Sequence, residues 1–145
     1  MTNLDHRVND LQDGRSVSLQ AGLERALSAT TGIALNLSGD RFSARDAAYS
    51  TTAWRAGLVA WRDVGRATLT AGAEFGRLEA DARLALFPET RADRSTRLTF
   101  GATFRQLGLA GFAPVTRIIF ERNRSSVEIY DYSRTRTEIG IVRAF

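Results

Sequence analysis

Apolar and polar residues alternate along almost the whole chain, and this period of two constrains the fold more than any other feature. In the clearest segment, Ala67, Leu69, Ala71, Ala73 and Phe75 alternate with charged, hydroxyl-bearing or glycine residues. Successive side chains of a β-strand point to opposite faces of a sheet, whereas a helix repeats its faces every 3.6 residues. The pattern therefore predicts antiparallel strands with one apolar and one polar face, and it argues against a helical protein.

About seven long strands are expected, joined as an all-β, antiparallel, up-and-down meander. One of them contains a change of phase, because its apolar residues are odd-numbered up to Phe75 and even-numbered from Leu78 onward. An extra residue reverses the side-chain phase of a strand, so we expect a β-bulge near Gly76. The sixth strand is apolar on both faces, and its orientation stays open. The predicted ranges are 15–27, 31–44, 49–62, 66–86, 94–109, 113–125 and 131–145.

The lengths of these strands and of their connections are typical of a transmembrane β-barrel. The strands exceed the 5–6 residues that are usual in globular sheets. Short turns also alternate with longer polar connections, as periplasmic turns and external loops do in outer-membrane barrels. The mean hydropathy of −0.20 leaves no membrane helix but allows a barrel, in which every second residue faces lipid. The short turns are expected at 29–32, 63–65 and 108–112, and the longer connections at 41–49, 88–93 and 123–130.

The last predicted strand ends the chain on an aromatic residue. Ile139, Ile141 and Phe145 share one face of this strand, and an aromatic strand end is typical of the interfacial girdle of an outer-membrane barrel. We interpret these three residues as a barrel-closing signal through which barrel-assembly machinery recognises the strand. Further aromatic residues expected in the girdle are Tyr49, Trp61, Tyr130 and Tyr132.

One partial domain is predicted, preceded by a short polar segment. Residues 1–13 form a polar leader or the remnant of an external loop, and residues 14–145 form a partial outer-membrane β-barrel domain. The leader has neither a basic n-region nor an apolar core, so we expect a secretion signal, and more of the barrel, upstream of a fragment. Bacterial single-chain barrels have even strand numbers. The missing strands would come from an N-terminal barrel half of similar size or from a second copy.

Composition argues against an enzyme and against a nucleic-acid-binding protein. There is no cysteine, and the one histidine, His6, lies in the polar leader, where it could serve a hydrolase only if the leader folded back. No catalytic, cofactor-binding or metal site is therefore expected. The net charge of +4 is spread over interspersed arginines and acidic residues. Without a basic cluster interleaved with aromatic residues, we expect no binding to nucleic acid.

Charged residues on the predicted polar faces are candidates to line a lumen. Mutually paired charges would suit any water-filled barrel, and together they could also form a conduit or a docking surface for a polar client. Glu24, Arg55, Arg66 and Glu121 lie on the same faces. The principal candidates are Glu74, Arg97, Arg105, Arg117, Arg134, Arg136 and Glu138.

The segment from Pro114 to Phe145, PVTRIIFERNRSSVEIYDYSRTRTEIGIVRAF, resembles the C-terminal end of the surface lipoprotein assembly modifier family. The shared features are a strand that begins at a proline, an Arg-Ser-rich loop at 124–126, the tyrosine-containing YDYSRTR at 130–136 and a closing strand ending in Phe. The segment FPETRADRSTR at 87–97 is similar as well. The resemblance implies a fourteen-stranded outer-membrane barrel that follows a periplasmic tetratricopeptide domain. This chain would be the C-terminal half of that barrel.

The resemblance also implies a non-enzymatic function in the cell outer membrane, where the barrel assists the translocation or surface display of lipoproteins. Its partners would be outer-membrane lipid, the client lipoprotein and the missing barrel half. One alternative is a porin-like passive diffusion channel or a small oligomeric barrel. Another is a soluble β-sandwich or lipocalin-like binder, against which the apolar outward faces argue.

Overall fold

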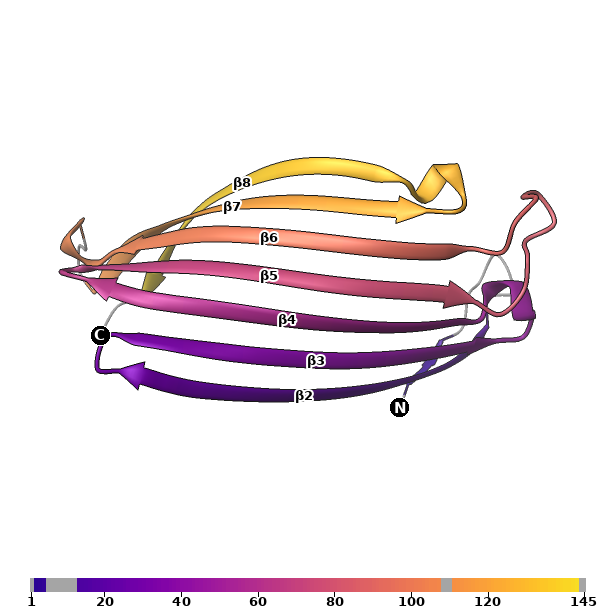
Figure 1. Cartoon of the computed structure of the whole chain (residues 1–145), viewed down its shortest axis with the longest axis horizontal. Coiled ribbons are helices and arrows are strands. Elements are labelled where there is room, and N and C mark those ends of the chain that lie inside the picture. The colour runs from indigo at the N-terminus through magenta and orange to yellow at the C-terminus, as the bar shows by residue number, and fades with distance from the viewer. Residues whose placement is uncertain (1, 5–12, 108–110, 144–145) are drawn as a thin grey trace.

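A computed structural model describes residues 2–4, 13–107 and 111–143, which form one antiparallel sheet. Neighbours in the sequence are neighbours in the sheet, in the order β1 to β8, and Figure 1 shows the long strands side by side. The predicted all-β meander is thereby confirmed. The long strands are β2 (Gly14–Ser28), β3 (Thr31–Ala44), β4 (Thr51–Val64), β5 (Ala67–Ala80), β6 (Ala92–Phe104), β7 (Phe112–Ser125) and β8 (Tyr132–Arg143).

Four shorter elements complete the described chain. A three-residue strand, β1 (Thr2–Leu4), pairs with Gly14–Ser16 at one end of β2; it lies in the predicted leader and was not expected. Single 3₁₀ turns occur within the connections. They are η2 (Ala47–Tyr49), η3 (Arg105–Leu107) and η4 (Glu128–Tyr130).

The prediction of a β-bulge near Gly76 is wrong. Gly76 pairs in unbroken register with Arg55 on β4 and Ser95 on β6. The phase change has another cause: past Phe75 the apolar positions give way to Arg77 and Glu79, so the apolar surface ends there while the strand continues. The observed strands are also shorter than the predicted ranges 66–86 and 94–109: β5 ends at Ala80, and β6 ends at Phe104.

The connections differ between the two ends of the sheet. At the end that we call the turn end, β2–β3 and β4–β5 are joined by the two-residue turns 29–30 and 65–66, and Gly65 supplies the positive φ of 60° that the second turn needs. The third connection there starts at η3, before the predicted turn at 108–112, which lies partly outside the described residues. At the opposite end, the loop end, the connections span 45–50, 81–91 and 126–131. Figure 1 shows the loop end at the right.

Strand pairing sorts the side chains onto two faces, an apolar face and a polar face. Directly paired residues share a face, and one row across the middle of the apolar face runs from Leu23 to Phe120. The sixth strand is now oriented: Ile118 and Phe120 belong to the apolar face, and Ile119 and Glu121 to the polar face. The row consists of Leu23, Leu35, Leu58, Ala73, Leu98 and Phe120.

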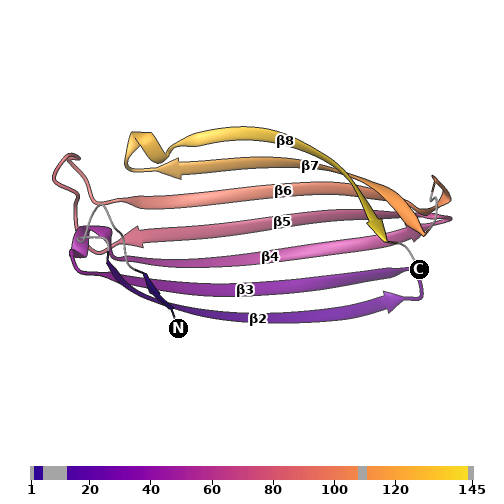
Figure 2. The ribbon, with the colours of Figure 1, turned by 180° about the vertical axis from the view of Figure 1, so that it is seen from behind.

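The apolar face is exposed rather than packed. Leu23, Leu58 and Phe75 are 69%, 49% and 55% exposed, and the hydrophobic residues buried within the described chain are confined to Ala53, Ala113, Ile119 and Val127. β8 forms one margin of the sheet, and β2 forms most of the other, where β1 pairs only with Gly14–Ser16. β2 and β8 lie on opposite sides in the front and back views (Figures 1 and 2) and are not paired with each other in the described structure. The described chain therefore builds no apolar core of its own, and another medium or partner must cover this surface.

Two aromatic residues predicted in a girdle lie elsewhere. Trp61 and Tyr132 belong by register to the polar face. The Trp61 ring covers Gly32 so closely that a Cβ at that position would lie 2.2 Å from it. Glycine at position 32 therefore makes room for the tryptophan at the turn end of the polar face.

Candidate functional site

The polar face carries a row of alternating charges, which we call the charge row. It consists of one residue from each of four neighbouring strands: Glu74 on β5, Arg97 on β6, Glu121 on β7 and Arg134 on β8. Each residue is directly paired with the next in the register of the sheet. Opposite charges that face each other across strands stabilise a sheet, so the register and the charge row support each other.

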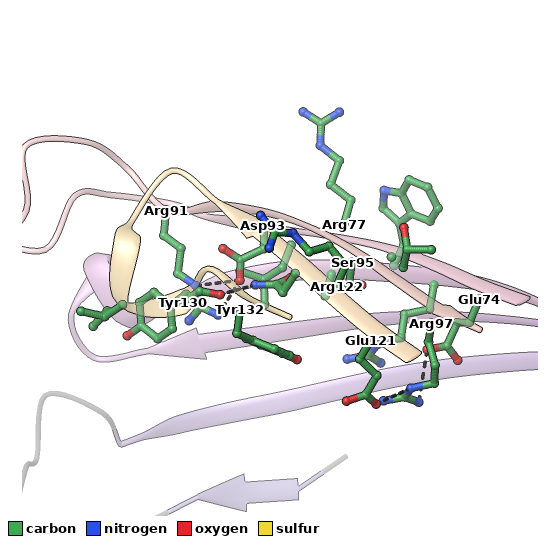
Figure 3. A pocket seen from close by; sticks show the side chains of 18 residues that line it. Glu74, Arg77, Arg91, Asp93, Ser95, Arg97, Glu121, Arg122, Tyr130 and Tyr132 are labelled. Carbon is green, nitrogen blue, oxygen red and sulfur yellow. Dashed lines mark hydrogen bonds and ion pairs between the residues drawn. The ribbon is translucent and has the colours of Figure 1, made fainter. Parts of the chain in front are cut away.

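Glu121 is the centre of the charge row. It is only 6% exposed, and its carboxylate accepts hydrogen bonds from Arg97 Nε at 2.7 Å and from Arg134 Nε. Arg97 also reaches Glu74, with 3.4 Å between Nη1 and Oε1. Figure 3 shows Glu74, Arg97 and Glu121 together at one side of the group. A buried carboxylate held between two guanidiniums is compensated electrostatically, which explains how it tolerates burial.

A second cluster lies nearer the turn end, between β7 and β8. Glu138 accepts from Arg117 Nη1 at 3.2 Å, and its other oxygen lies 3.0 Å from Arg136 Nε.

Six of the seven predicted lumen candidates therefore lie on the polar face of the strands. The seventh, Arg105, is in η3 at the turn end, where its Nη2 lies 2.9 Å from Asp63 Oδ1.

The residues of the predicted closing signal lie on the other face. Ile139 and Ile141 belong to the apolar face of β8 and are 83% and 72% exposed. Phe145 lies outside the described residues. The two isoleucines thus extend the exposed apolar face to the margin of the sheet.

The first strands carry the same row with much smaller side chains. Opposite Glu74 the row continues through Gly57, Asn36 and Gly22 on β4, β3 and β2. These positions and Arg55 line a hollow of about 550 Å³ in the polar face. At the level of the charge row, the polar face is therefore open over β2–β4 and crossed by paired charges over β5–β8. Nearer the loop end, Arg55 Nη1 on β4 lies 3.1 Å from Asp40 Oδ2 on β3.

Polar contacts bind two of the connections together at the loop end. Asp93 is 5% exposed and accepts from Arg91 Nη2 and Ser125 Oγ, both at 2.6 Å. The Arg91 guanidinium lies 3.6 Å from the centre of the Tyr130 ring, a cation–π contact. Arg91, Asp93 and Tyr130 line a pocket of about 380 Å³ (Figure 3). Because its polar groups satisfy one another, we interpret the cluster as a latch between loops 81–91 and 126–131.

A second latch joins β3 to the start of loop 81–91. Arg41 donates to both oxygens of Asp81, with 2.6 Å from Nη1 to Oδ1, and also to Thr52 Oγ1 at 2.8 Å. Hydrogen bonding to Arg41 holds the pKa of the Asp81 carboxyl below its ordinary value, because the guanidinium favours the charged form. The ion pair thus fixes the loop where it leaves β5.

The described residues contain no cluster of three or more possible metal ligands. No helix of the described chain is long and apolar enough to cross a membrane. The candidate catalytic histidine, His6, lies outside the described residues. The polar side chains that the fold brings together can form hydrogen bonds with water, and hydrogen bonds or ion pairs with a polar chain.

No known protein family, no curated protein and no solved structure matches the chain. The candidate site therefore stands on its own geometry.

Sequence reasoning missed Asp63 and Asp93, which hold Arg105 and Arg91, because both lie at strand ends. For Asp63, its place on the polar-face parity of β4 was an available signal.

Proposed function

We propose that the chain is a segment of an outer-membrane β-barrel that assists the translocation or surface display of lipoproteins without catalysing a reaction. The observation that carries the proposal is the contrast between an exposed apolar face and an opposite face whose charges are paired. In a barrel wall, the first would contact lipid and the second would line an aqueous lumen.

Strand geometry supports a membrane location. The seven long strands have 12–15 residues, and about 9–11 residues suffice for a tilted strand to cross the hydrocarbon core. Backbone groups of the inner strands are paired within the sheet, which a bilayer requires. In a soluble sandwich, a second sheet would instead have to cover the apolar face. The proposal takes lipid as the covering medium.

Strand direction bears on what closes the barrel. Apart from the three residues of β1, which pair with Gly14–Ser16, the margins of the sheet are β2 and β8, and both run from the loop end to the turn end because the seven long strands alternate in direction. Two copies related by rotation about the barrel axis would therefore pair β8 of one copy in parallel with β2 of the other. Bacterial barrels are antiparallel. Antiparallel closure at both margins needs a partner segment with an odd number of strands, which favours a missing barrel half over a second copy.

The lipoprotein client is proposed from the resemblance of the C-terminal segment. The margin of β8, with its unpaired backbone groups, is suited to pair with the missing half or to template a strand of the client. Barrel-assembly machinery would act on the same strand. The hollow over β2–β4 would give a polar chain room inside the wall.

Deletion of the gene followed by protease shaving of intact cells tests the proposal. We expect lipoproteins to be lost from the cell surface while their total amount is unchanged, and to return when the gene is restored. Unchanged surface lipoproteins in the deletion strain would contradict the lipoprotein function. If the protein is nevertheless found in the outer-membrane fraction of the parent strain, the proposal of an outer-membrane barrel would still stand.

A passive diffusion channel is the second candidate function, and the hollow beside the charge row favours it. Conductance of the purified protein in a planar bilayer separates the two. Steady conductance without any client supports the channel. A closed state that opens only with a client lipoprotein supports the first proposal.

A further inference from the structure

Three arginines form a row on the apolar face at the loop end, which we call the arginine row. Arg77 on β5 is paired in register with Arg94 on β6, and Arg94 with Arg124 on β7. All three side chains are exposed. In Figure 3, Arg77 extends away from the charge row, in keeping with its place on the opposite face.

Two of the three arginines in the arginine row have no carboxylate partner within the described part of the chain. Arg77 contacts Glu79, whereas Arg94 and Arg124 form no ion pair within the described part of the chain. The other arginines near this edge of the apolar face are paired, Arg41 with Asp81 and Arg122 with Asp131. Like charges directly opposite each other destabilise a sheet. An anion bound between Arg94 and Arg124 would remove this cost.

The arginine row lies where the apolar surface ends. One step toward the turn end are Phe75, Thr96 and Arg122, the last in an ion pair with Asp131, and the step after that holds Ala73, Leu98 and Phe120. In the arginine row itself, β4 places the exposed Trp54 next to Arg77. A guanidinium at this level can reach the headgroup region while lipid chains cover the residues beside it. Arginine binds phosphate through two parallel hydrogen bonds, which suits it to a phosphorylated headgroup.

We propose that Arg94 and Arg124, flanked by Arg77, form a binding site for the phosphate of an anionic lipid at the loop end of the apolar face. This inference rests on the proposed membrane function, because it places the apolar face in lipid. It goes beyond that function by assigning a specific lipid contact to one leaflet.

The same face offers a matched control at the turn end. Arg25 and Arg62 are exposed on the apolar face, and neither is paired with another arginine across the strands: Arg25 faces Ile33, and Arg62 faces Thr31 and Leu69. Replacing this pair removes the same charge from the same face. It leaves the arginine row intact.

Fluorescence of Trp54 provides the readout, since it lies beside Arg77. The chain has two tryptophans, so a Trp61→Phe background makes Trp54 the sole reporter. The purified protein in this background is inserted into phosphatidylcholine vesicles that contain either brominated phosphatidic acid or brominated phosphatidylcholine, whose bromines quench a neighbouring indole. The ratio of the two quenching efficiencies gives the local preference for the anionic lipid.

We expect Trp54 to prefer phosphatidic acid, and the variant R94Q/R124Q to lower that preference roughly 25-fold, at about fivefold for each arginine near an anionic surface. R25Q/R62Q should keep it. Equal quenching by both lipids in the parent protein, or a preference that survives in R94Q/R124Q, would overturn the lipid site. So would a preference that 10 mM inorganic phosphate abolishes, on the order of cellular phosphate levels, because the site would then take free phosphate. If neither lipid quenches Trp54, the proposed membrane function itself fails, and this inference fails with it.

Discussion

The arginines of the charge row and those of the arginine row differ in what neutralises them. On the polar face, Arg97 and Arg134 share the buried Glu121, and Arg117 contacts Glu138. On the apolar face, Arg94 and Arg124 face each other with no carboxylate in contact within the described chain. The same side chain thus occurs in two electrostatic states in one sheet. The difference indicates that the charge row is neutralised within the sheet, whereas Arg94 and Arg124 depend on their surroundings.

A charge placed in the middle of the apolar face is the most severe test of this difference. Leu98→Arg puts a guanidinium where we expect hydrocarbon and should destabilise the protein in a bilayer by about 2–4 kcal/mol. Thr99→Arg, one residue further on the polar face, should have a much smaller effect. The measurement is the denaturant midpoint of folding into phosphatidylcholine vesicles. Equal losses for the two variants would mean that both faces meet the same medium.

Removing the carboxylate from the centre of the charge row should have the next largest effect. Glu121→Gln removes the negative charge on β7 that Arg97 on β6 and Arg134 on β8 share. Loss of charge-assisted hydrogen bonds to a buried group predicts a decrease in the free energy of unfolding of about 1.5–3 kcal/mol. Glu74→Gln is the control, because Glu74 is more exposed and has one contact at 3.4 Å. A control variant as unstable as Glu121→Gln would argue against a central role for Glu121.

The reverse change makes the apolar face resemble the polar one. Arg94→Glu would place a carboxylate between Arg77 and Arg124 and so reproduce an alternating row. In uncharged detergent we expect a gain of roughly 0.2–1 kcal/mol for each exposed pair formed. The preference of Trp54 for phosphatidic acid should disappear at the same time. A variant less stable than the parent in that detergent would show that the three arginines do not repel one another.

The smallest expected effect comes from the latch at the loop end. Because Arg41 lowers the pKa of Asp81, the ion pair stabilises the folded state at any pH above the ordinary carboxyl pKa of about 4. This contribution is lost as the pH falls through the lowered pKa. The melting temperature of Asp81→Asn in detergent should lie slightly below that of the parent protein at pH 7, and the two should converge toward pH 2. A constant difference over this range would exclude the pair as its source.

Period-two alternation was sufficient to predict the strands and the polar side of Glu74, Arg97 and Arg134, because side-chain parity is a local property. It could not predict that these residues meet Glu121 in one row, since strand register depends on where each turn begins. The phase change after Phe75 is present in the sequence, but the β-bulge near Gly76 that was predicted from it is wrong. Alternation of polarity ends with the apolar surface, whereas hydrogen bonding carries the strand on to Ala80.

For the arginine row, side-chain parity held information from which no prediction was made. Arg94 has the parity of Leu98, and Arg124 has that of Phe120, so the sequence already assigned both arginines to the apolar side. Their facing positions required the pairing of β6 with β7. The loop-end latches were out of reach because they join segments that are distant in the sequence, such as Arg41 and Asp81.

The most direct test of the account is which side chains meet water in the membrane-inserted protein. The native sequence has no cysteine, so single cysteines at positions 98 and 100 on the apolar face, and at 95 and 99 on the polar face, can be labelled with a water-soluble maleimide in vesicles. We expect rapid labelling at 95 and 99 and protection at 98 and 100, with all four labelled after denaturation. Equal labelling at neighbouring positions in the vesicles would contradict it.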